Sequence, residues 1–446
     1  MNSALTSTAP TDGAERQPAV AGKRLQTDWS SPAMRSRVRA RYRAEATFRY
    51  TGLAALLLAA LFLGFLLFTI VRDGWTGFQS TDVKVSVTYD PATLMIDPAA
   101  LKTPEAAQAL RSADYAALMI EAVGQLGGAA DVVSEGAWLI LRENLEADPT
   151  LLGKTQSVWV PAKSNIDLLA KGKFDLAEPE LTRGVSDDDV SDYTQLKQRG
   201  LLRTGFNRIF VTMADSTNPE LAGIWGAALG SLLTLLITIG LSFPIGVMAA
   251  IYLEEFAPRN RWTDLIEVSI NNLAAVPSII FGLLGLAVFL NFFGMPRSAP
   301  LVGGLTLALM TLPVIVIASR VAIKAVPPSI RDAALGIGSS PIQVVFQHVI
   351  PMALPGILTG TIIGMARALG ETAPLLLIGM RAFVVDTPQG FESPATVLPV
   401  QVFLWSDDVQ RGFIEKTSAA IIVLLVILLL MNSLAIYLRN KFERRW

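Results

Sequence analysis

The chain has 446 residues, of which 52% are hydrophobic and only 17% are charged, and its mean hydropathy is +0.46. Soluble globular proteins carry about 25% charged residues, so this composition excludes an ordinary soluble protein and favours a membrane protein. The sequence has no cysteine and one histidine, His348. Disulfides, thiolate metal sites and histidine clusters are therefore excluded, and we expect no metal and no cofactor bound by this chain.

The first 50 residues form a basic segment, with nine Arg or Lys against four Asp or Glu. Because Arg and Lys concentrate on the cytoplasmic side of membrane spans, we expect residues 1–50 to lie in the cytoplasm. The apolar run 51–71 that follows is too long for a typical signal-peptide core and lacks a convincing cleavage site. We therefore interpret it as a retained first transmembrane helix.

Six apolar stretches are long enough to cross a bilayer, which takes about 20 mostly apolar residues. They are Thr51–Val71, Leu221–Leu253, Leu273–Phe293, Ser298–Ser319, Met352–Met380 and Thr417–Leu438. Six crossings return the chain to the side on which it began. We expect the basic tail 439–446 to be cytoplasmic as well, with a five-helix core over 221–438.

Residues 74–218 carry 20 acidic against 13 basic side chains and contain no apolar run long enough to span. This segment is far too long for a structureless loop. It follows the first span of a chain that begins in the cytoplasm, so we expect it on the extracytoplasmic side. The alternation of Val83, Val85 and Val87 predicts a strand, and Thr103–Val123 is typical of a helix. We therefore predict a soluble α/β extracytoplasmic insert domain.

Two stretches of the insert superficially resemble ligand-binding motifs. The acidic run Ser186–Asp192 favours a solvated face or a helix start over a metal site, because runs of acids are usually exposed. The stretch "DPTLLGKT" (Asp148–Thr155) ends like a nucleotide-binding loop, but the motif requires a glycine where Asp148 stands. We infer that this chain does not hydrolyse ATP itself.

Residues 324–351, between the fourth and fifth spans, predict a cytoplasmic elbow of two short helices. Ser329 and Asp332 have capping-box spacing, and Gly336 and Gly338 would end this first helix. Ser340 followed by Pro341 begins a second helix. Two small residues, Ala333 and Ala334, give the first helix a slim face that a partner surface can approach. An ordinary connecting loop is the alternative.

The elbow also resembles the coupling loop of bacterial ABC importer permeases. The shared pattern is Asp332-Ala333-Ala334, three residues, Gly338, and finally Ile350-Pro351. The family usually has Glu in place of Asp332 and an aliphatic residue in place of His348. The resemblance implies that Asp332, Ala333, Ala334, Gly338 and Pro351 belong to the surface that contacts ATPase subunits. We expect His348 to be an exposed loop residue without a catalytic role.

A second resemblance narrows the family. "ARALGETAPLLL" (Ala366–Leu377) is similar to the PstA type of phosphate importer permease, as are Ala274–Gly285 and Gly223–Leu232. The resemblance covers roughly 221–446. It implies an all-α polytopic permease with six transmembrane helices in a bacterial inner membrane. Many relatives carry an Arg and a Glu near the end of the fourth span, where this chain has Ile317 and Arg320.

The same resemblance implies a set of partners. These are a second, PstC-like permease subunit, a PstB-like ATPase dimer that binds ATP and Mg, an extracytoplasmic phosphate-binding protein, inorganic phosphate and membrane lipid. Nothing in the sequence points to nucleic acid.

Arg367 and Glu371 interrupt the fifth apolar run. A charged side chain at the centre of a bilayer costs about 2.5–3.5 kcal/mol on the mild insertion scale, so both should face the protein interior or water. Their spacing of four would place them on one helix face. Since a guanidinium can donate two parallel hydrogen bonds to phosphate, we interpret Arg367, Glu371 and Thr372 as part of a substrate path. A purely structural ion pair is the alternative.

We therefore expect a permease subunit of an ATP-driven phosphate importer. It should not be an enzyme, because no nucleophile–base set or metal cluster appears in the sequence. A permease for another oxyanion, such as sulfate or molybdate, is the nearest alternative. A membrane sensor with an external ligand-binding domain is an alternative of another class, although six spans are more than a sensor needs.

Overall fold

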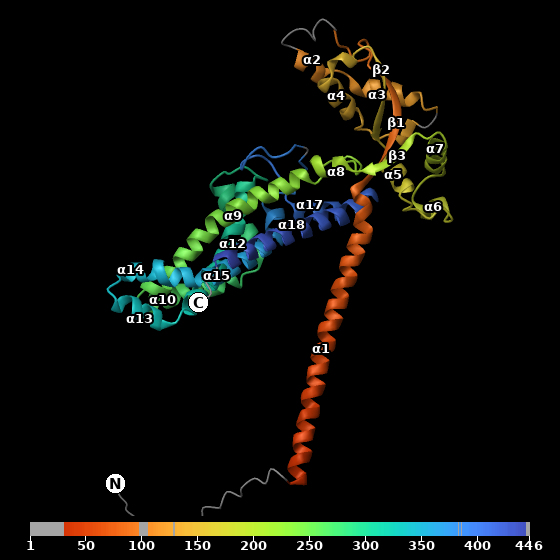
Figure 1. The fold of residues 1–446 in the computed structure, drawn as a ribbon. Helices are drawn as coiled ribbons and strands as arrows, with labels where there is room; N and C mark the ends of the chain where they lie inside the picture. Colours follow the sequence, from red (N-terminus) through yellow and green to blue (C-terminus); the bar gives the residue numbers. More distant parts are fainter. Residues whose placement is uncertain (1–30, 98–105, 128–129, 382, 385, 443–446) are drawn as a thin grey trace, which may run out of the picture. The chain divides into compact units, whose positions relative to one another are not determined.

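The computed structural model describes residues 31–97, 106–127, 130–381, 383–384 and 386–442 (Figure 1). The chain divides into two compact units, 1–66 and 67–446. Most of the first unit is helix α1 (Pro32–Gly74), which continues into the second unit. The predicted span 51–71 is thus helical, and the helix begins earlier than expected because the arginine-rich stretch before the span joins it.

Five helices in the described part of the chain are long and apolar enough to cross a membrane. They include α1, α9 (Trp225–Ile251), α12 (Pro300–Lys324), α15 (Ile350–Gly370) and α18 (Gly412–Phe442). A sixth span is possible if two bent helices count as one. The prediction of a helical protein with several spans is therefore confirmed.

The third predicted span is not one straight helix. Helix α10 (Arg261–Ala274) and helix α11 (Ser278–Gly285) meet at a bend of 100°. Pro277 causes the break, because a proline disfavours the helical conformation in the residue before it and has no N–H to donate. The apolar helix begins only at Ser278 and continues through a π-helical stretch, Leu286–Phe292. The prediction of one span over Leu273–Phe293 was wrong at its start.

The fifth predicted span, Met352–Met380, is also interrupted. Helix α15 ends at Gly370, Glu371 is extended (φ −77°, ψ 123°), and a short helix α16 (Ala373–Leu377) follows. Pro374 explains the break, because it cannot donate to the carbonyl of Gly370 and its ring would clash there. The spacing of Arg367 and Glu371 had predicted that both lie on one continuous helix. This prediction was wrong, because only Arg367 belongs to α15.

Helix α12 is central to the permease part and contacts α9, α10, α11 and α15. Small residues permit this approach. A Cβ atom added at Gly364 of α15 would lie 2.9 Å from Thr311 Cγ2, and one added at Gly304 of α12 would lie 2.5 Å from Ile237 Cβ. A Cβ atom added at Gly360 of α15 would likewise lie 2.1 Å from Ala318 Cβ of α12. The pair Gly226 and Gly230 instead faces the segments around 214 and 395–396.

The remaining helices of the permease part are short. They are α13 (Pro328–Gly336), α14 (Pro341–Val344) and α17 (Leu398–Ser406), with π-helical stretches at Tyr252–Phe256 and Val345–Val349. Helix α17 contacts α9 and α18, and α16 contacts α11.

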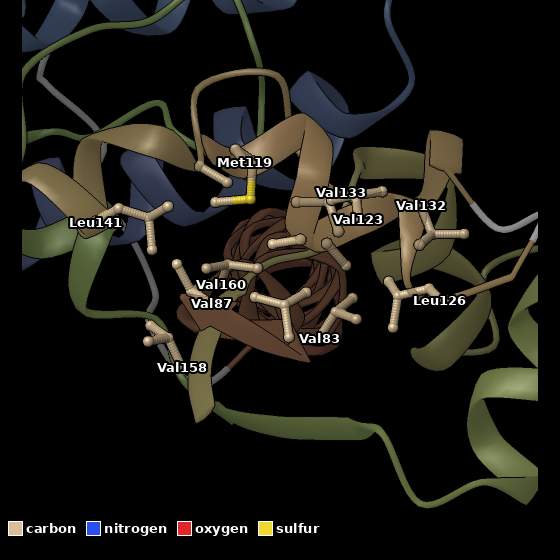
Figure 2. Close-up of a cluster of buried hydrophobic side chains, with 14 of the residues drawn as sticks. Val83, Val87, Met119, Val123, Leu126, Val132, Val133, Leu141, Val158 and Val160 are labelled. Carbon is tan, nitrogen blue, oxygen red and sulfur yellow. The ribbon is translucent and has the colours of Figure 1, made fainter. Parts of the chain in front are cut away.

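The insert contains a three-stranded antiparallel sheet in the order β2-β1-β3. The strands are β1 (Gln79–Thr88), β2 (Thr155–Pro161) and β3 (Leu202–Phe206). Val83, Val85 and Val87 are almost fully buried on one face, so the predicted strand is confirmed. Figure 2 shows Val83 and Val87 gathered with side chains from the neighbouring strand and helices.

The described part of the insert also contains seven short helices. They are α2 (Ala106–Ser112), α3 (Tyr115–Gly124), α4 (Trp138–Ala147), α5 (Ser164–Ala170), α6 (Glu180–Arg183), α7 (Asp187–Gln198) and α8 (Arg208–Thr212), with 3-10 turns at Trp75–Phe78, Ala130–Val132 and Pro149–Leu151. The buried core extends from Val83 to Leu196 and lies wholly within 74–218. Independent folding of this domain stays a prediction.

Three local predictions in the insert have clear outcomes. The helix expected over Thr103–Val123 is two helices, because the Asp114 side chain caps α3 by accepting from Ala117 N at 2.9 Å; residues 103–105 lie outside the described residues. The acidic run is a helix start, where the Ser186 hydroxyl accepts from Asp189 N at 3.0 Å. The stretch ending at Thr155 leads into β2 rather than into a helix.

Glu220 lies between the insert and α9 and is buried, with its Oε1 accepting a hydrogen bond from Ser134 Oγ at 2.7 Å. Burial raises the pKa of the Glu220 carboxyl above its usual value. A raised carboxyl pKa contributes stability that is fully present below the unfolded pKa, about 4.3, and is lost as the pH rises through the folded pKa. Ionised Glu220 therefore destabilises the fold at neutral pH.

We expect Glu220→Gln to raise the thermal unfolding temperature at neutral pH, because glutamine can still accept from Ser134 without carrying a charge. The gain should shrink when unfolding is measured near pH 5, where Glu220 is closer to its neutral form. Glu178→Gln, at an exposed position of the insert, is the matched control and should have little effect. An equal gain at both pH values would contradict the prediction.

Candidate functional site

Arg367 lies in the last turn of α15, beside the point where the helix ends. Its Nε donates to Glu371 Oε1 at 3.4 Å, and its side chain is 44% exposed whereas that of Glu371 is 18% exposed. The contact is long, and partly exposed ion pairs are weak. The two terminal nitrogens of the guanidinium donate to no described residue. The planar donor face of Arg367 is therefore open to an anion.

Thr372 directly follows Glu371 and is the N-cap of α16, and its carbonyl accepts from Leu375 N and Leu376 N. Its hydroxyl makes no hydrogen bond to a described residue, so it adds a free donor beside Glu371. Arg367 comes 17 residues after Ile350, which corresponds to about 26 Å along the axis of a helix. The three predicted path residues thus lie together, near the end of α15 that is remote from the elbow.

The elbow consists of α13 and α14 with a sharp turn between them. Gly338 in this turn has φ +90°, a conformation that favours glycine. Ser340 caps the second helix as predicted, and it does so through a capping box, with Gln343 N donating to Ser340 Oγ at 3.4 Å and Ser340 N donating to Gln343 Oε1 at 2.9 Å. The one predicted at Ser329 is wrong. Helix α13 already begins at Pro328, whose fixed φ suits the first helical position.

The predicted contact residues do not all face outward. Asp332, Ala333 and Gly338 are exposed, and Pro351 is half-buried. Ala334 is only 5% exposed, because it packs against buried side chains such as Val344 of the elbow itself. The slim outer face of α13 is therefore formed by Ala333 without Ala334.

The predicted position of His348 in an exposed loop was also wrong, whereas its lack of a catalytic role stays a prediction. His348 is half-buried within the π-helical stretch Val345–Val349 rather than in an exposed loop.

An ion pair fastens the elbow to the end of α9. Arg331 of α13 donates through Nη2 to Glu255 Oε1 at 2.6 Å, and through Nε to both carboxylate oxygens at 3.2 and 3.3 Å. The same guanidinium donates to the carbonyls of Val326 at 2.7 Å and Ile323 at 3.0 Å. Glu255 lies in the π-helical stretch that extends α9. Arg331 thus connects α13 to the ends of α9 and α12.

Arg320 forms a second connection at this end of the bundle. It bonds to Glu254 in the extension of α9 and to Glu267 of α10, with Nη2 2.8 Å from Glu267 Oε2. Lys324 Nζ lies 3.4 Å from Glu254 Oε1. Arg320 is therefore paired with carboxylates of α10 and of the extension of α9. It has no Glu partner within its own span, where many relatives carry one. Sequence reasoning missed both connections, although Glu254 and Glu255 follow a 33-residue run without any charge, Leu221–Leu253.

Two family descriptions match the chain. Residues 242–446 match the binding-protein-dependent transport system inner membrane component, and residues 35–180 match a domain of unknown function, DUF3333. The probable ABC transporter permease protein YqgI of Bacillus subtilis (strain 168) is 32% identical over 256 residues, which cover 55% of this chain and 84% of that protein. The chain therefore belongs to the family of ABC transporter permeases.

Further relatives define the branch of the family. The phosphate transport system permease protein PstA of Yersinia pestis is 29% identical over 51% of this chain and 76% of its own length. PstA 1 of Mycobacterium tuberculosis (strain CDC 1551 / Oshkosh) is 33% identical over 35% of this chain and 51% of its own length. The chain is thus a PstA-like ABC transporter permease, a multi-pass membrane protein that is not itself an enzyme.

Proposed function

We propose that this chain is a permease subunit of an ATP-driven phosphate importer and forms part of its translocation path. The observation that carries the proposal is the open donor face of Arg367 beside Glu371, at the end of a membrane helix. A guanidinium with two free terminal nitrogens matches two oxygens of a phosphate ion. The names of the PstA relatives, which are phosphate transport permeases, support phosphate as the anion.

The geometry suits passage rather than storage. Glu371 holds Arg367 when the path is empty, through a contact that is long enough to be replaced by phosphate. Its negative charge then repels the bound dianion, so phosphate binds weakly and leaves easily, as a conducting path requires. The Thr372 hydroxyl offers a further donor to a phosphate oxygen.

The elbow supplies the coupling. We propose that ATPase subunits, which bind ATP and Mg, dock on the exposed face of α13 around Asp332, Ala333 and Gly338. Their movement passes through Arg331 and Glu255 to α9 and α12 and opens the path alternately to each side. A second permease subunit and an extracytoplasmic phosphate-binding protein complete the importer. In this arrangement both termini are cytoplasmic, in the inner membrane of a bacterium.

Transport by the purified complex in proteoliposomes tests the proposal. We expect ATP-dependent uptake of radiolabelled phosphate that requires the binding protein and is competed by unlabelled phosphate but not by sulfate or molybdate. Uptake of sulfate or molybdate in place of phosphate would assign the permease to another oxyanion. Absence of ATP-driven flux for all three anions, with every subunit present, would favour the sensor.

A further inference from the structure

Buried charged side chains join the insert to the first turns of α18. Lys171 follows α5, and its side chain is 1% exposed. Its Nζ lies 2.6 Å from Asp167 Oδ2 and 2.5 Å from Oε1 of Glu415, a residue of α18 whose side chain is 5% exposed. A lysine of the insert is therefore held between a carboxylate of its own domain and one of the last membrane helix.

The remaining carboxylate oxygens of this network are also bonded. Asp167 Oδ1 accepts from Thr81 N of β1 at 2.8 Å, and Glu415 Oε2 accepts from Thr76 Oγ1 at 3.0 Å. Removing one member of a buried ion pair is strongly destabilising, because it leaves an uncompensated charge away from water. The network resists separation of the insert from α18.

Neighbouring contacts extend the same junction. Arg411, directly before α18, donates through Nη1 to the carbonyl of Arg183 at 2.8 Å. Gly77 lies so close to α18 that a Cβ atom there would be 2.7 Å from Ala419 Cβ. Lys416, the residue after Glu415, is buried with its Nζ 5.1 Å from the centre of the Phe210 ring. The 3-10 turn before β1 and helices α6 and α8 of the insert thus all contact the first turns of α18 or the residue before it.

Helix α18 continues from this junction to the substrate helix. It packs against α15, where Ala368 and Leu369 share a hydrophobic core with Leu424 and Ile427 of α18. Ala368 and Leu369 directly follow Arg367. A displacement of the insert that carries α18 with it would therefore bear on the segment that holds the proposed phosphate site.

We propose that Lys171 and Glu415 are positioning residues that make the insert and α18 move as one body, so that the insert is an external lever on α15. Burial and direct bonding on both sides of the junction carry the proposal. The claim that insert and α18 form one body is independent of which anion is transported. Only the action on Arg367 rests on the proposed function.

The distance between two spin labels, one on the insert and one on α18, tests whether the two move as one body. The chain has no cysteine, so Ser157→Cys on β2 and Val426→Cys on α18, both exposed positions, give a clean label pair. With the full chain in lipid nanodiscs, pulsed electron paramagnetic resonance should give one narrow distance distribution. In the complete complex the distribution should be the same without nucleotide and with trapped nucleotide.

Lys171→Met should lose the narrow distribution, because Asp167 and Glu415 are then buried side by side without their shared cation. Glu415→Gln should broaden it less, since the contact between Lys171 and Asp167 remains. Lys163→Met is the matched control; its ion pair with Asp131 spans 2.7 Å but is exposed, so the narrow distribution should persist. Circular dichroism verifies folding, and Glu415→Gln carries the test if Lys171→Met fails to fold.

A functional readout separates positioning from simple stabilisation. In the complete complex, Lys171→Met should retain basal ATP hydrolysis but lose its stimulation by the binding protein. A broad or nucleotide-dependent distance in the unmodified protein, or a narrow one in Lys171→Met, would overturn the single body. If Lys171→Met broadens the distance distribution but leaves the stimulation of ATP hydrolysis unaltered, the insert and α18 form one body that does not act as a lever on α15. If the complex fails to transport phosphate, the proposed function is wrong but the distance measurements still test the single body.

Discussion

Replacing Arg367 with glutamine should abolish phosphate flux while the complex remains assembled. The variant keeps a polar side chain but loses the charged fork of the proposed anion site, whose two terminal nitrogens donate to no described residue. Hydrogen bonds to charged groups contribute about 1.5–3 kcal/mol each, so even one lost contact predicts at least a ~10-fold decrease in flux. Uptake by proteoliposomes, with subunit stoichiometry measured on the same sample, checks the result.

Three related variants define the role of the pair. Arg367→Lys should also fail substantially, because lysine offers a point charge without the bidentate fork. Glu371→Gln should impair uptake less if Glu371 only positions Arg367. Arg297→Gln, at an exposed arginine, is the matched control and should transport normally. Normal transport by the double variant Arg367→Gln/Glu371→Gln would show that the pair is scaffolding and that the anion site is elsewhere.

Ala333→Glu should remove the ATPase from the complex. Ala333 is exposed on α13, so a glutamate there adds bulk and charge to the proposed docking face without disturbing the fold beneath it. We expect loss of ATPase copurification together with loss of ATP-driven uptake, while the permease still inserts in the membrane. Copurification from solubilised membranes measures this directly.

Two comparisons make the elbow experiment specific. Ala177→Glu, the same substitution at an exposed alanine of the insert, should leave the ATPase bound. Ala334→Glu should instead destabilise the elbow, because Ala334 is packed against the core of the chain. Unchanged ATPase binding and uptake in Ala333→Glu would contradict the docking surface.

Local patterns in the sequence predicted the elements whose cause is local. The alternation Val83, Val85, Val87 predicted β1, and Ser340 with Pro341 predicted the start of α14. The breaks in the third and fifth predicted spans were missed, because those spans were assigned from hydropathy alone. Pro277 and Pro374 lie in long apolar runs whose average hydropathy stays high, but each removes a hydrogen-bond donor and interrupts the span.

Connections between elements could not be predicted from one sequence. Arg331 and Glu255 are 76 positions apart, and Lys171 and Glu415 are 244 positions apart. Periodicity and capping rules act within a few residues, so they identify a charged residue without identifying its partner. The proposed path residues were predicted as a group because Arg367, Glu371 and Thr372 are neighbours in the chain, and Arg367 still bonds to Glu371 although α15 ends at Gly370.

The π-helical stretch Val345–Val349 lies between the elbow and the helix that carries Arg367. Such a π-helical stretch contains one residue more than a regular α-helix of the same length along its axis. Each residue of an α-helix turns the chain by about 100°, so a helical wheel drawn without interruption from Pro341 misplaces the whole of α15 by about that angle. The direction in which Arg367 faces, relative to the start of α14 at Pro341, therefore depends on this single additional residue.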